Sequence, residues 1–481
     1  MKHWRLLCTL ALVAAFVAGY CYWMADRGDN YLPLLVPAGL VAVWLVVARM
    51  ETALLLTALL TPFAIDVALL DGMELSLPVE PLMILFTGVF LFRVLASHSY
   101  DPRLLRHPVS LLLLASLVWM AITSATSAIP LASVKYTLAR VWFVVPFFYA
   151  AAQMFRQPGR IRHLYWAYAL GLGVVILIAT AKTVGNFSDL QTLHRVMKPF
   201  YNDHTAYGCV IALMLPAAVH FVFARSSKGW RRLVPVALVA LLCTGLFFSY
   251  CRAAWISVVA AIGVYALVRS GMKMKWMLAL FALGVGLFFA HQGDVLYKLG
   301  KNTQDSSYTL ADQVKSISNI STDASNLERL NRWASAFRMW GERPVFGTGP
   351  GTYQFLYGSY QKSYQLSTIS TNAGDLGNAH SEYIGPLTEQ GVPGALLVVA
   401  LFLATFATGV RVYRTAKNPA IARLALAFTL SLLTYYVHGV FNNFLDTDKL
   451  SVPFWAFTAA IVALDLYSEK SDPERKETLP R

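Results

Sequence analysis

Long apolar runs, separated by short polar segments, constrain this chain more than any other feature. Apolar residues make up 57% of the 481 residues and charged residues only 14%, and a run of about 20 apolar residues is long enough to cross a bilayer as a helix. The runs predict an all-α polytopic membrane protein with about 12–14 transmembrane helices. The expected helices are centred on residues 6–24, 31–48, 52–70, 79–96, 108–126, 137–154, 163–183, 205–224, 233–249, 253–268, 276–290, 391–411, 421–440 and 451–467.

One long polar interval, residues 291–390, breaks this apolar pattern. We therefore expect an N-terminal transmembrane bundle of about eleven helices over residues 1–290. The polar interval then forms a large loop, residues 391–467 form the C-terminal transmembrane helices, and residues 468–481 form a charged tail.

Part of the polar interval has recognisable local structure. Apolar residues recur at helical spacing over Asn326–Trp340, which predicts an amphipathic helix that caps the bundle or lies at the membrane surface. The glycines of Gly347–Gly351 predict a tight turn after it. No regular structure is predicted for Thr352–Ala379, which is rich in Tyr, Ser, Gln and Thr.

Basic residues concentrate on alternate polar segments. With a cytoplasmic N-terminus, more than half of the 40 Lys and Arg residues lie on the inner segments, and most of the 26 acidic residues lie on the outer ones. The positive-inside rule then places both termini in the cytoplasm and the polar interval outside. The same bias accounts for the net charge of +14, so nucleic-acid binding is not expected.

Three arginines are candidates for binding an anion. Arg252 lies between two apolar runs with almost no loop between them, so it either reaches lipid headgroups or binds a phosphate at the outer membrane boundary. Arg329 lies on the predicted amphipathic helix and offers a bidentate fork for phosphate oxygens. Arg140 lies inside a predicted transmembrane helix, where a functional or buried-pair role is expected.

A histidine and a carboxylate precede the helix that re-enters the membrane. His380 has a side chain that titrates near neutral pH, so it either accepts a proton from an attacking hydroxyl or has a structural role. Glu382 or Glu389 could orient it or share its role. The acidic pair Asp446 and Asp448 is a weaker candidate, as oxygen ligands for Mg²⁺ or Mn²⁺.

Several short fragments between Tyr201 and Gly394 follow one another in a recognisable order. They are Ser249-Tyr-Cys-Arg252-Ala-Ala-Trp255, Glu328-Arg329-x3-Trp333, Pro344-Val-Phe-Gly-Thr-Gly-Pro-Gly-Thr352, Ala379-His380-Ser-Glu-Tyr-Ile384 and Glu389-Gln-Gly-Val-Pro-Gly394. Together with a long outer loop between two membrane helices, they resemble the O-antigen ligase and O-antigen polymerase superfamily of bacterial envelope glycosyltransferases. One position departs from the usual family pattern, because Ser381 stands where an asparagine follows the histidine.

The resemblance implies transfer of a glycan from undecaprenyl diphosphate to an acceptor hydroxyl on the periplasmic face of the bacterial inner membrane. The acceptor is the lipid A core in ligases and another lipid-linked repeat unit in polymerases. It further implies an inverting reaction without cofactor, metal or nucleotide, in which preorganised arginines stabilise the departing diphosphate. Arg252 and Arg329, with Arg140 possible, would hold the diphosphate, while His380 would act as general base supported by Glu382.

Two other classes of function stay open at the sequence level. A transporter of lipid-linked glycans would also need basic residues, although no inverted repeat of the kind common in transporters stands out. A non-catalytic partner in an envelope polysaccharide complex would tolerate point changes at Arg252 and His380. Between ligase and polymerase, the look of the large loop slightly favours a ligase.

Overall fold

A computed structural model describes residues 35–70, 73–97, 100–184, 195–224, 229–277, 279–280, 283, 324–366, 370 and 377–468. Within these ranges, nine helices are long and apolar enough to cross a membrane, and three shorter apolar helices accompany them. The protein is thus an all-α polytopic membrane protein, as predicted. The expected helix at 6–24, most of the one at 276–290 and nearly all of the tail lie outside the described residues.

The chain forms two compact units, residues 1–54 and residues 55–481. In the first unit the structure describes α2 (Leu35–Ala48) and the start of α3 (Met50–Leu60). Side chains such as Leu40 and Trp44 are exposed along α2, as expected for a helix that contacts lipid.

The second unit begins with the rest of α3 and a correction to the predicted helix 52–70. The helix ends at Leu60, and a 3₁₀ turn (Thr61–Phe63) leads into an antiparallel hairpin of β1 (Ile65–Leu70) and β2 (Met73–Leu77). Pro62 explains the end of the helix, because proline has no N–H to donate and disfavours a helical conformation in the residue before it. Asp66 then pairs across the hairpin with Ser76, whose hydroxyl donates to the Asp66 carboxylate.

The remaining predicted helices are present, with ends that differ by a few residues in most cases. The N-terminal half contains α4 (Val79–Ser97), α5 (Pro102–Arg106), α6 (Pro108–Ala125), α7 (Pro130–Val144), a buried π-helical turn (Val145–Ala150), α8 (Ala151–Met154) and α9 (Pro158–Val184). They are followed by α11 (His204–Phe223), α12 (Leu233–Phe248), α13 (Arg252–Arg269), α18 (Ile384–Thr415), α19 (Pro419–His438) and α20 (Asp448–Tyr467).

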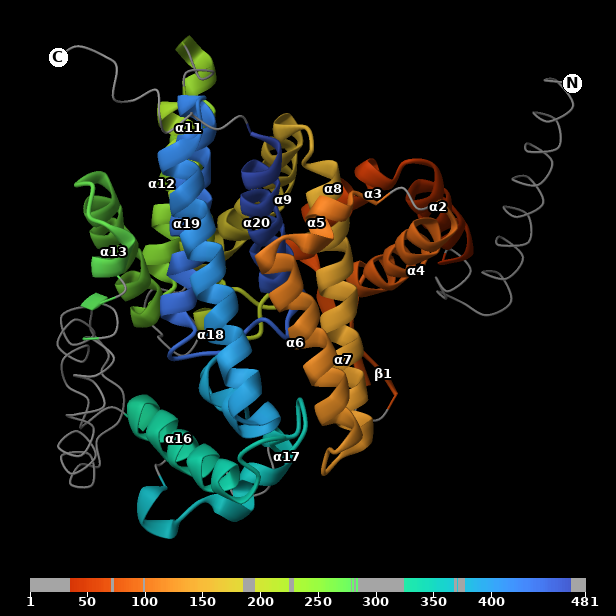
Figure 1. The fold of residues 1–481 in the computed structure, drawn as a ribbon, viewed down its shortest axis with the longest axis vertical. Helices are drawn as coiled ribbons and strands as arrows, with labels where there is room; N and C mark the ends of the chain where they lie inside the picture. The colour runs from red at the N-terminus through yellow and green to blue at the C-terminus, as the bar shows by residue number, and fades with distance from the viewer. Residues whose placement is uncertain are drawn as a thin grey trace, which may run out of the picture. The chain divides into compact units, whose positions relative to one another are not determined.

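The last two helices form the core of the second unit. α19 packs against α11, α13 and α18, while α20 packs against α18, α19 and the π-helical turn (Figure 1). Small residues such as Ala459 and Ala460 are fully buried along α20 and allow neighbouring helices to approach closely. Gly409 of α18 likewise leaves no room for a Cβ beside the side chain of Thr429 in α19.

The polar interval contains helical structure at one end of the bundle. α16 (Ala324–Glu342) confirms and slightly extends the predicted amphipathic helix, and it packs against the start of α18 (Figure 1). It is followed by α17 (Tyr353–Leu356) and two 3₁₀ turns, Tyr357–Tyr360 and Ser363–Gln365. We call the end of the bundle that carries α16 the loop end.

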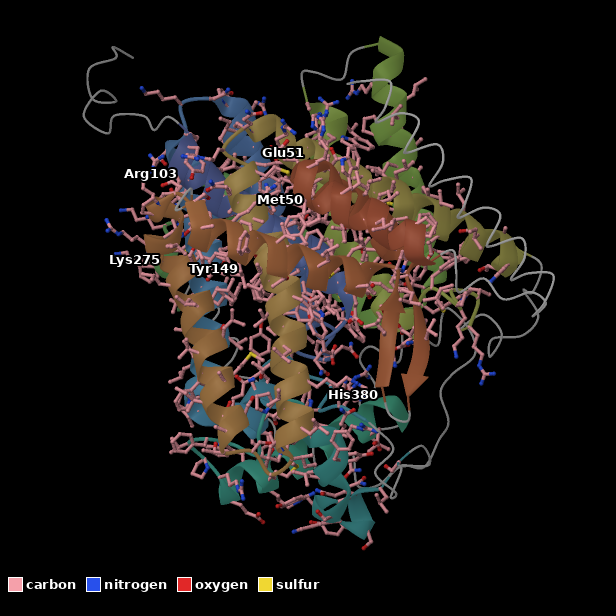
Figure 2. The ribbon with its side chains drawn as sticks, turned by 90° about the vertical axis from the view of Figure 1, so that its right-hand side faces the viewer. Met50, Glu51, Arg103, Tyr149, Lys275 and His380 are labelled. Carbon is pink, nitrogen blue, oxygen red and sulfur yellow. The ribbon has the colours of Figure 1, made fainter. Side chains whose placement is uncertain are left out.

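A network of charged and polar side chains lies at the opposite end of the bundle, near Arg103 (Figure 2). The buried Asp101 carboxylate accepts hydrogen bonds from Arg103 (2.9 Å), Arg156 (3.1 Å) and the Tyr467 hydroxyl (2.8 Å). These contacts, of which that with Arg103 is the strongest influence, lower the pKa of Asp101 well below its ordinary value. The network ties the end of α20 to the polar segments beside α5 and α9.

Candidate functional site

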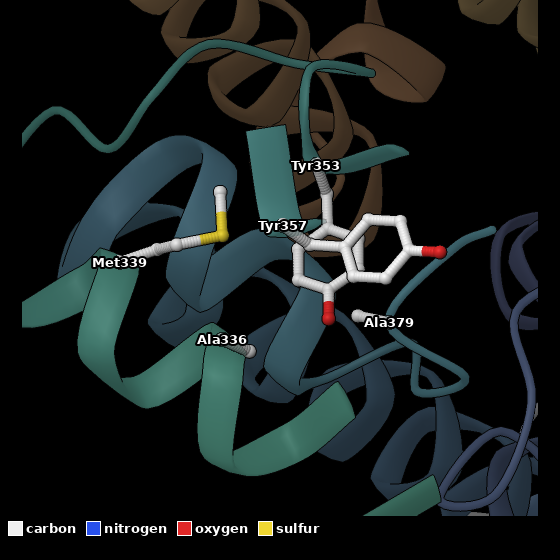
Figure 3. Close-up of a cluster of buried hydrophobic side chains, with 5 residues drawn as sticks. All are labelled: Ala336, Met339, Tyr353, Tyr357 and Ala379. Carbon is white, nitrogen blue, oxygen red and sulfur yellow. The ribbon is translucent and has the colours of Figure 1, made fainter. Parts of the chain in front are cut away.

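α16 presents its buried face to the segment that precedes His380. Ala336 and Met339 on this face are fully buried against Tyr353, Tyr357 and Ala379 (Figure 3). The two tyrosine rings stack with their centroids 5.3 Å apart. Aromatic packing of this kind contributes about 0.5–1.5 kcal/mol beyond area burial, so it stabilises α17 and the turn after it, against which α16 packs.

α18 is broken near its start, at Gly391. This residue has φ 68° and ψ −170°, which only glycine adopts readily, so the helix consists of two segments. The glycine-rich turn docks on the break: Thr348 N–H donates to Thr388 O (3.1 Å), and Gly349 N–H donates to Glu389 O (2.8 Å). In return, Val392 N–H donates to Pro344 O (2.9 Å). The predicted tight turn therefore satisfies backbone groups that a broken membrane helix leaves unpaired.

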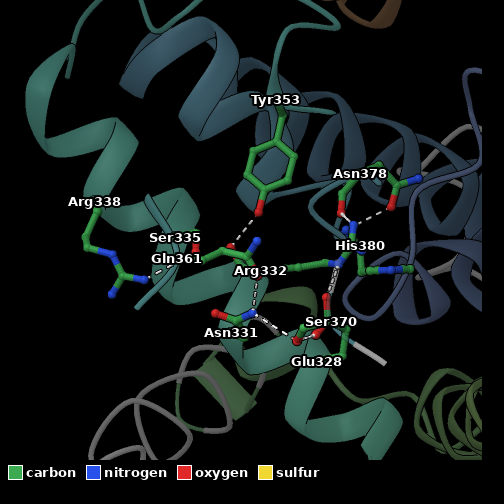
Figure 4. Close-up of polar contacts among 10 residues, drawn as sticks. All are labelled: Glu328, Asn331, Arg332, Ser335, Arg338, Tyr353, Gln361, Ser370, Asn378 and His380. Atoms are coloured by element: carbon green, nitrogen blue, oxygen red, sulfur yellow. Dashed lines mark hydrogen bonds and ion pairs between the residues drawn. The ribbon is translucent and has the colours of Figure 1, made fainter. Parts of the chain in front are cut away.

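A buried ion pair on α16 holds the segment before His380 in place. Arg332 Nε contacts Glu328 Oε1 at 2.8 Å, one helical turn away, and both side chains are less than a tenth exposed. Another guanidinium nitrogen of Arg332 donates to Asn378 O (3.1 Å), and the Tyr353 hydroxyl donates to Arg332 O (2.8 Å) (Figure 4). Asn378 Oδ1 in turn accepts the His380 N–H at 3.1 Å, so α16 positions the histidine backbone.

His380 lies at the loop end (Figure 2), near the positive charges of Arg329 and Arg332. Its φ of 48° is left-handed and therefore strained for a non-glycine residue. Burial, followed by the positive charges of Arg329 and Arg332, lowers the pKa of His380 to about 3. The imidazole is therefore neutral at pH 7 and carries one nitrogen able to accept a proton.

Asn442, in the loop between α19 and α20, lies close to the side chain of His380 and influences its pKa. Its amide also lies 3.1 Å from Nε2 of the buried His438, while Arg329 Nε donates to the neighbouring Phe441 O (3.2 Å). Asn442 thus connects two imidazole rings, and its own side chain is only 2% exposed.

The N-terminus of α13 belongs to the same region. Burial raises the pKa of Cys251 to about 12, with the negative charge of Asp203 adding to the shift and the positive charge of Arg329 reducing it. Cys251 is the N-cap residue that directly precedes Arg252, the first residue of α13. We call Asp203, Arg329, His380 and Asn442 the histidine cluster.

The side chains of Arg140 and Glu382 lie on the side of the 378–383 segment that faces away from the histidine cluster. Both line a cavity of about 250 Å³ between α6, α7, α18, α19 and α20. Arg140 contacts the Tyr136 hydroxyl at 3.1 Å. Glu382 Oε1 accepts hydrogen bonds from the hydroxyl of Tyr435 and from the backbone N–H groups of Phe444 (2.9 Å) and Leu445 (3.0 Å).

The predicted site residues therefore form two groups. The structure brings Arg329, His380 and the start of α13 together. Glu382 and Arg140 instead line the cavity, and within the part of the chain described Glu382 does not hydrogen-bond to His380. Glu389 does not reach His380 either, because its carboxylate accepts the Tyr353 N–H at 3.0 Å.

Ser381, which departs from the family pattern, caps the start of α18. Its hydroxyl accepts the N–H groups of Tyr383 and Ile384, each at 3.3 Å. The side-chain amide beside the histidine comes instead from Asn442, about sixty residues later in the chain. Sequence reasoning missed Asn442, and its only local signal was a pair of asparagines soon after a histidine at the end of an apolar run.

The acidic pair does not converge on one point. Asp448 is buried and paired with Lys449 (3.2 Å), whereas Asp446 lines the cavity. Among the described residues, no three His, Cys, Asp or Glu side chains are grouped so that they could hold a metal ion.

Comparison with protein families identifies the segment that carries the histidine cluster. Residues 236–399 match the O-antigen ligase family, and this range contains Arg252, Arg329 and His380. This match supports the resemblance of the chain to the O-antigen ligase superfamily. A comparison with curated proteins found no match.

Members of this superfamily are membrane glycosyltransferases of the O-antigen ligase or polymerase type. The match begins in α12 and ends within α18, so it covers α13, α16 and the glycine-rich turn. Arg140 and Asn442 lie outside it, on helices and loops that complete the site from other parts of the chain.

Proposed function

We propose that the protein transfers a glycan from undecaprenyl diphosphate to an acceptor hydroxyl, as an inverting O-antigen ligase-type enzyme. The observation that carries this proposal is a neutral histidine beside two arginines at one end of a membrane-spanning bundle. The charge pattern of the sequence supports a periplasmic loop end, with both termini in the cytoplasm.

In this mechanism, Arg252 and Arg329 hold the diphosphate. Arg252 is the first residue of α13, so its side chain and the N–H groups of the helix N-terminus both favour an anion there. The diphosphate then lies next to His380, because Arg329 is one of the two positive charges that act on the imidazole. The arginines stabilise the negative charge that the leaving group acquires.

His380 removes the proton from the acceptor hydroxyl. The acceptor oxygen forms a bond to the anomeric carbon, the bond from that carbon to the diphosphate oxygen breaks, and the electron pair leaves with the diphosphate. The proton passes to the free ring nitrogen of His380, while Asn442 holds the other nitrogen and so fixes the ring orientation. Bound diphosphate also neutralises the nearby arginines, which raises the pKa of His380 and strengthens it as a base.

The cavity residues have a different role in this proposal. Arg140 lies beside carboxylates rather than in the histidine cluster, so we assign the diphosphate to Arg252 and Arg329 and leave Arg140 as a counter-ion in the cavity. Glu382 supports His380 indirectly, by anchoring the loop that carries Asn442.

The decisive test uses purified protein, a lipid-linked oligosaccharide and a suitable acceptor. His380→Ala and Arg252→Ala are compared with matched controls, His163→Ala at an exposed position of α9 and Arg269→Ala at the far end of α13. Loss of a general base lowers the rate by about 10²–10⁴-fold, so we expect that loss in His380→Ala and wild-type rates in both controls. Full activity in both site variants would sink the assignment, and loss of wild-type activity on chelation would favour a metal-dependent reaction.

The products of the same reaction separate the other candidates. Discharge of the glycan onto a different acceptor indicates a ligase, whereas a ladder of chain lengths on the lipid carrier indicates a polymerase. Any transfer in detergent, where no second compartment exists, excludes a transporter as the whole function. Site variants with normal transfer in a reconstituted complex would indicate a non-catalytic assembly partner.

A further inference from the structure

The cavity beside the histidine cluster has the polar groups of a binding site. Asp446 lines this cavity and is an exposed residue. The amide side chains of Gln354, Asn378 and Asn443 line the same space. The cavity therefore offers acceptors and donors within one enclosed volume.

Among the cavity-lining polar atoms that lack a hydrogen-bond partner within the described residues, two come after α19 in the chain. They are Nε1 of Trp455, whose residue is only 3% exposed, and Oδ1 of Asn443. A buried polar group without a partner costs about 1–3 kcal/mol, so such groups are expected where a ligand or water completes them. Both residues belong to the loop and helix that follow α19.

The charge of the cavity selects against anions. Its only cation among the described lining residues is Arg140, which lies near the carboxylates of Glu382 and Asp446. Burial, followed by the negative charge of Glu382, raises the pKa of Asp446 to about 6. A raised carboxyl pKa is expected where burial and nearby carboxylates disfavour negative charge. The same surroundings would repel a diphosphate.

The shape and surface suit one sugar ring. The volume of about 250 Å³ is near the lower end of the range for small-molecule sites, which is about 300–1,000 Å³. Carboxylate and amide groups hydrogen-bond to neighbouring hydroxyls, and an aromatic face such as that of Trp455 packs against the C–H groups of a pyranose. Apolar residues such as Leu397 and Leu401 also line the cavity.

We propose that this cavity binds a neutral sugar residue, separately from the diphosphate, with Asp446 and Trp455 as its main polar contacts. That the sugar belongs to a glycan substrate of the enzyme rests on the proposed function. Sugar binding is measured without catalytic turnover, so a failure of the sugar-binding proposal can be distinguished from a failure of the proposed glycosyl transfer.

The test is saturation-transfer NMR on the full-length protein in lipid nanodiscs that contain no sugar detergent. Methyl glycosides of neutral hexoses serve as probes, titrated to about 50 mM, because single sugars bind weakly. The variants are Trp455→Phe, which keeps the ring but removes the indole N–H, and Asp446→Ala. The matched control is Trp276→Phe, at an exposed position of the described chain.

We expect saturable binding of at least one methyl glycoside to the wild type and to Trp276→Phe. The Kd should rise about tenfold in each cavity variant, which corresponds to about 1.4 kcal/mol. Inorganic pyrophosphate should not displace the glycoside. Absence of saturable binding, unchanged Kd in both cavity variants, or displacement by pyrophosphate would each overturn the proposal.

Discussion

The break in α18 gives the sharpest prediction about this fold. Replacing Gly391 with alanine adds a Cβ that collides with Val345 O, at a φ of 68° that alanine adopts only under strain. Gly385 provides the matched control in the same helix, because a Cβ there meets nothing closer than Ala379 Cβ at 4.0 Å. We therefore expect Gly391→Ala to destabilise the protein and Gly385→Ala to leave its stability unchanged or slightly raised.

The magnitude follows from the contacts at the break. A residue held in a sparsely populated backbone region costs about 1–3 kcal/mol. The collision also forces the glycine-rich turn away from α18, with loss of the bonds from Thr348, Gly349 and Val392. Backbone hydrogen bonds contribute about 0.5–1.5 kcal/mol each, so the full effect is about 2.5–7.5 kcal/mol.

Two measurements check this prediction in nanodiscs. The thermal unfolding midpoint should fall for Gly391→Ala but not for Gly385→Ala. Hydrogen exchange should show lost protection of the Thr348 and Gly349 amides, which donate to α18 in the wild type. A normal midpoint together with protected amides in Gly391→Ala would refute the idea that this turn holds the break.

Three further predictions concern the site. As the pH is lowered from 7 to 5, the unfolded chain binds a proton at His380, whereas folded His380, with a pKa of about 3, does not. The free energy of unfolding should therefore decrease by about 1–2 kcal/mol over this range. A His380→Gln variant whose free energy of unfolding depends on pH in the same way would contradict this. Asn442→Leu should lower kcat about 10–100-fold with KM unchanged, whereas Asn442→Asp should restore part of the rate and shift its pH profile; equal rates in all three proteins would exclude an orienting role. Glu382→Gln should lower the thermal midpoint, as should Tyr435→Phe at the same oxygen, because hydrogen bonds to a charged group contribute about 1.5–3 kcal/mol; a rate loss at normal stability would instead make Glu382 catalytic.

The membrane helices were predictable from hydropathy alone, because an apolar segment inside lipid must form all its backbone hydrogen bonds internally and therefore folds as a helix. The prediction of α16 followed from the spacing of apolar residues such as Leu330, Ala334 and Phe337, although the face that is buried carries Ala336 and Met339. The hairpin after Leu60 was not predicted, because its apolar residues look like the continuation of a helix. Pro62 was the local signal that the helix ends there.

The candidate site was predictable only in part, because tertiary contacts decide which side chains meet. His380 and Arg329 share a cluster because α16 lies across the start of α18. Glu382 is only two residues from His380 but lines the cavity, and Asn442 comes close to His380 from the loop between α19 and α20. Sequence distance is a poor guide to contact where a chain reverses direction in a left-handed turn, as it does at His380.

Residues 378–383 form a single wall shared by two chemically different compartments. The cationic histidine cluster lies on one face of this wall and the carboxylate-rich cavity on the other. Mutational effects on the two compartments are therefore not expected to add, since residues that share a backbone segment usually show interaction energies of about 0.5–3 kcal/mol. A double-mutant cycle between His380 and Asp446 would measure how strongly occupancy of one compartment is felt in the other, and by thermodynamic reciprocity the coupling has the same size in both directions.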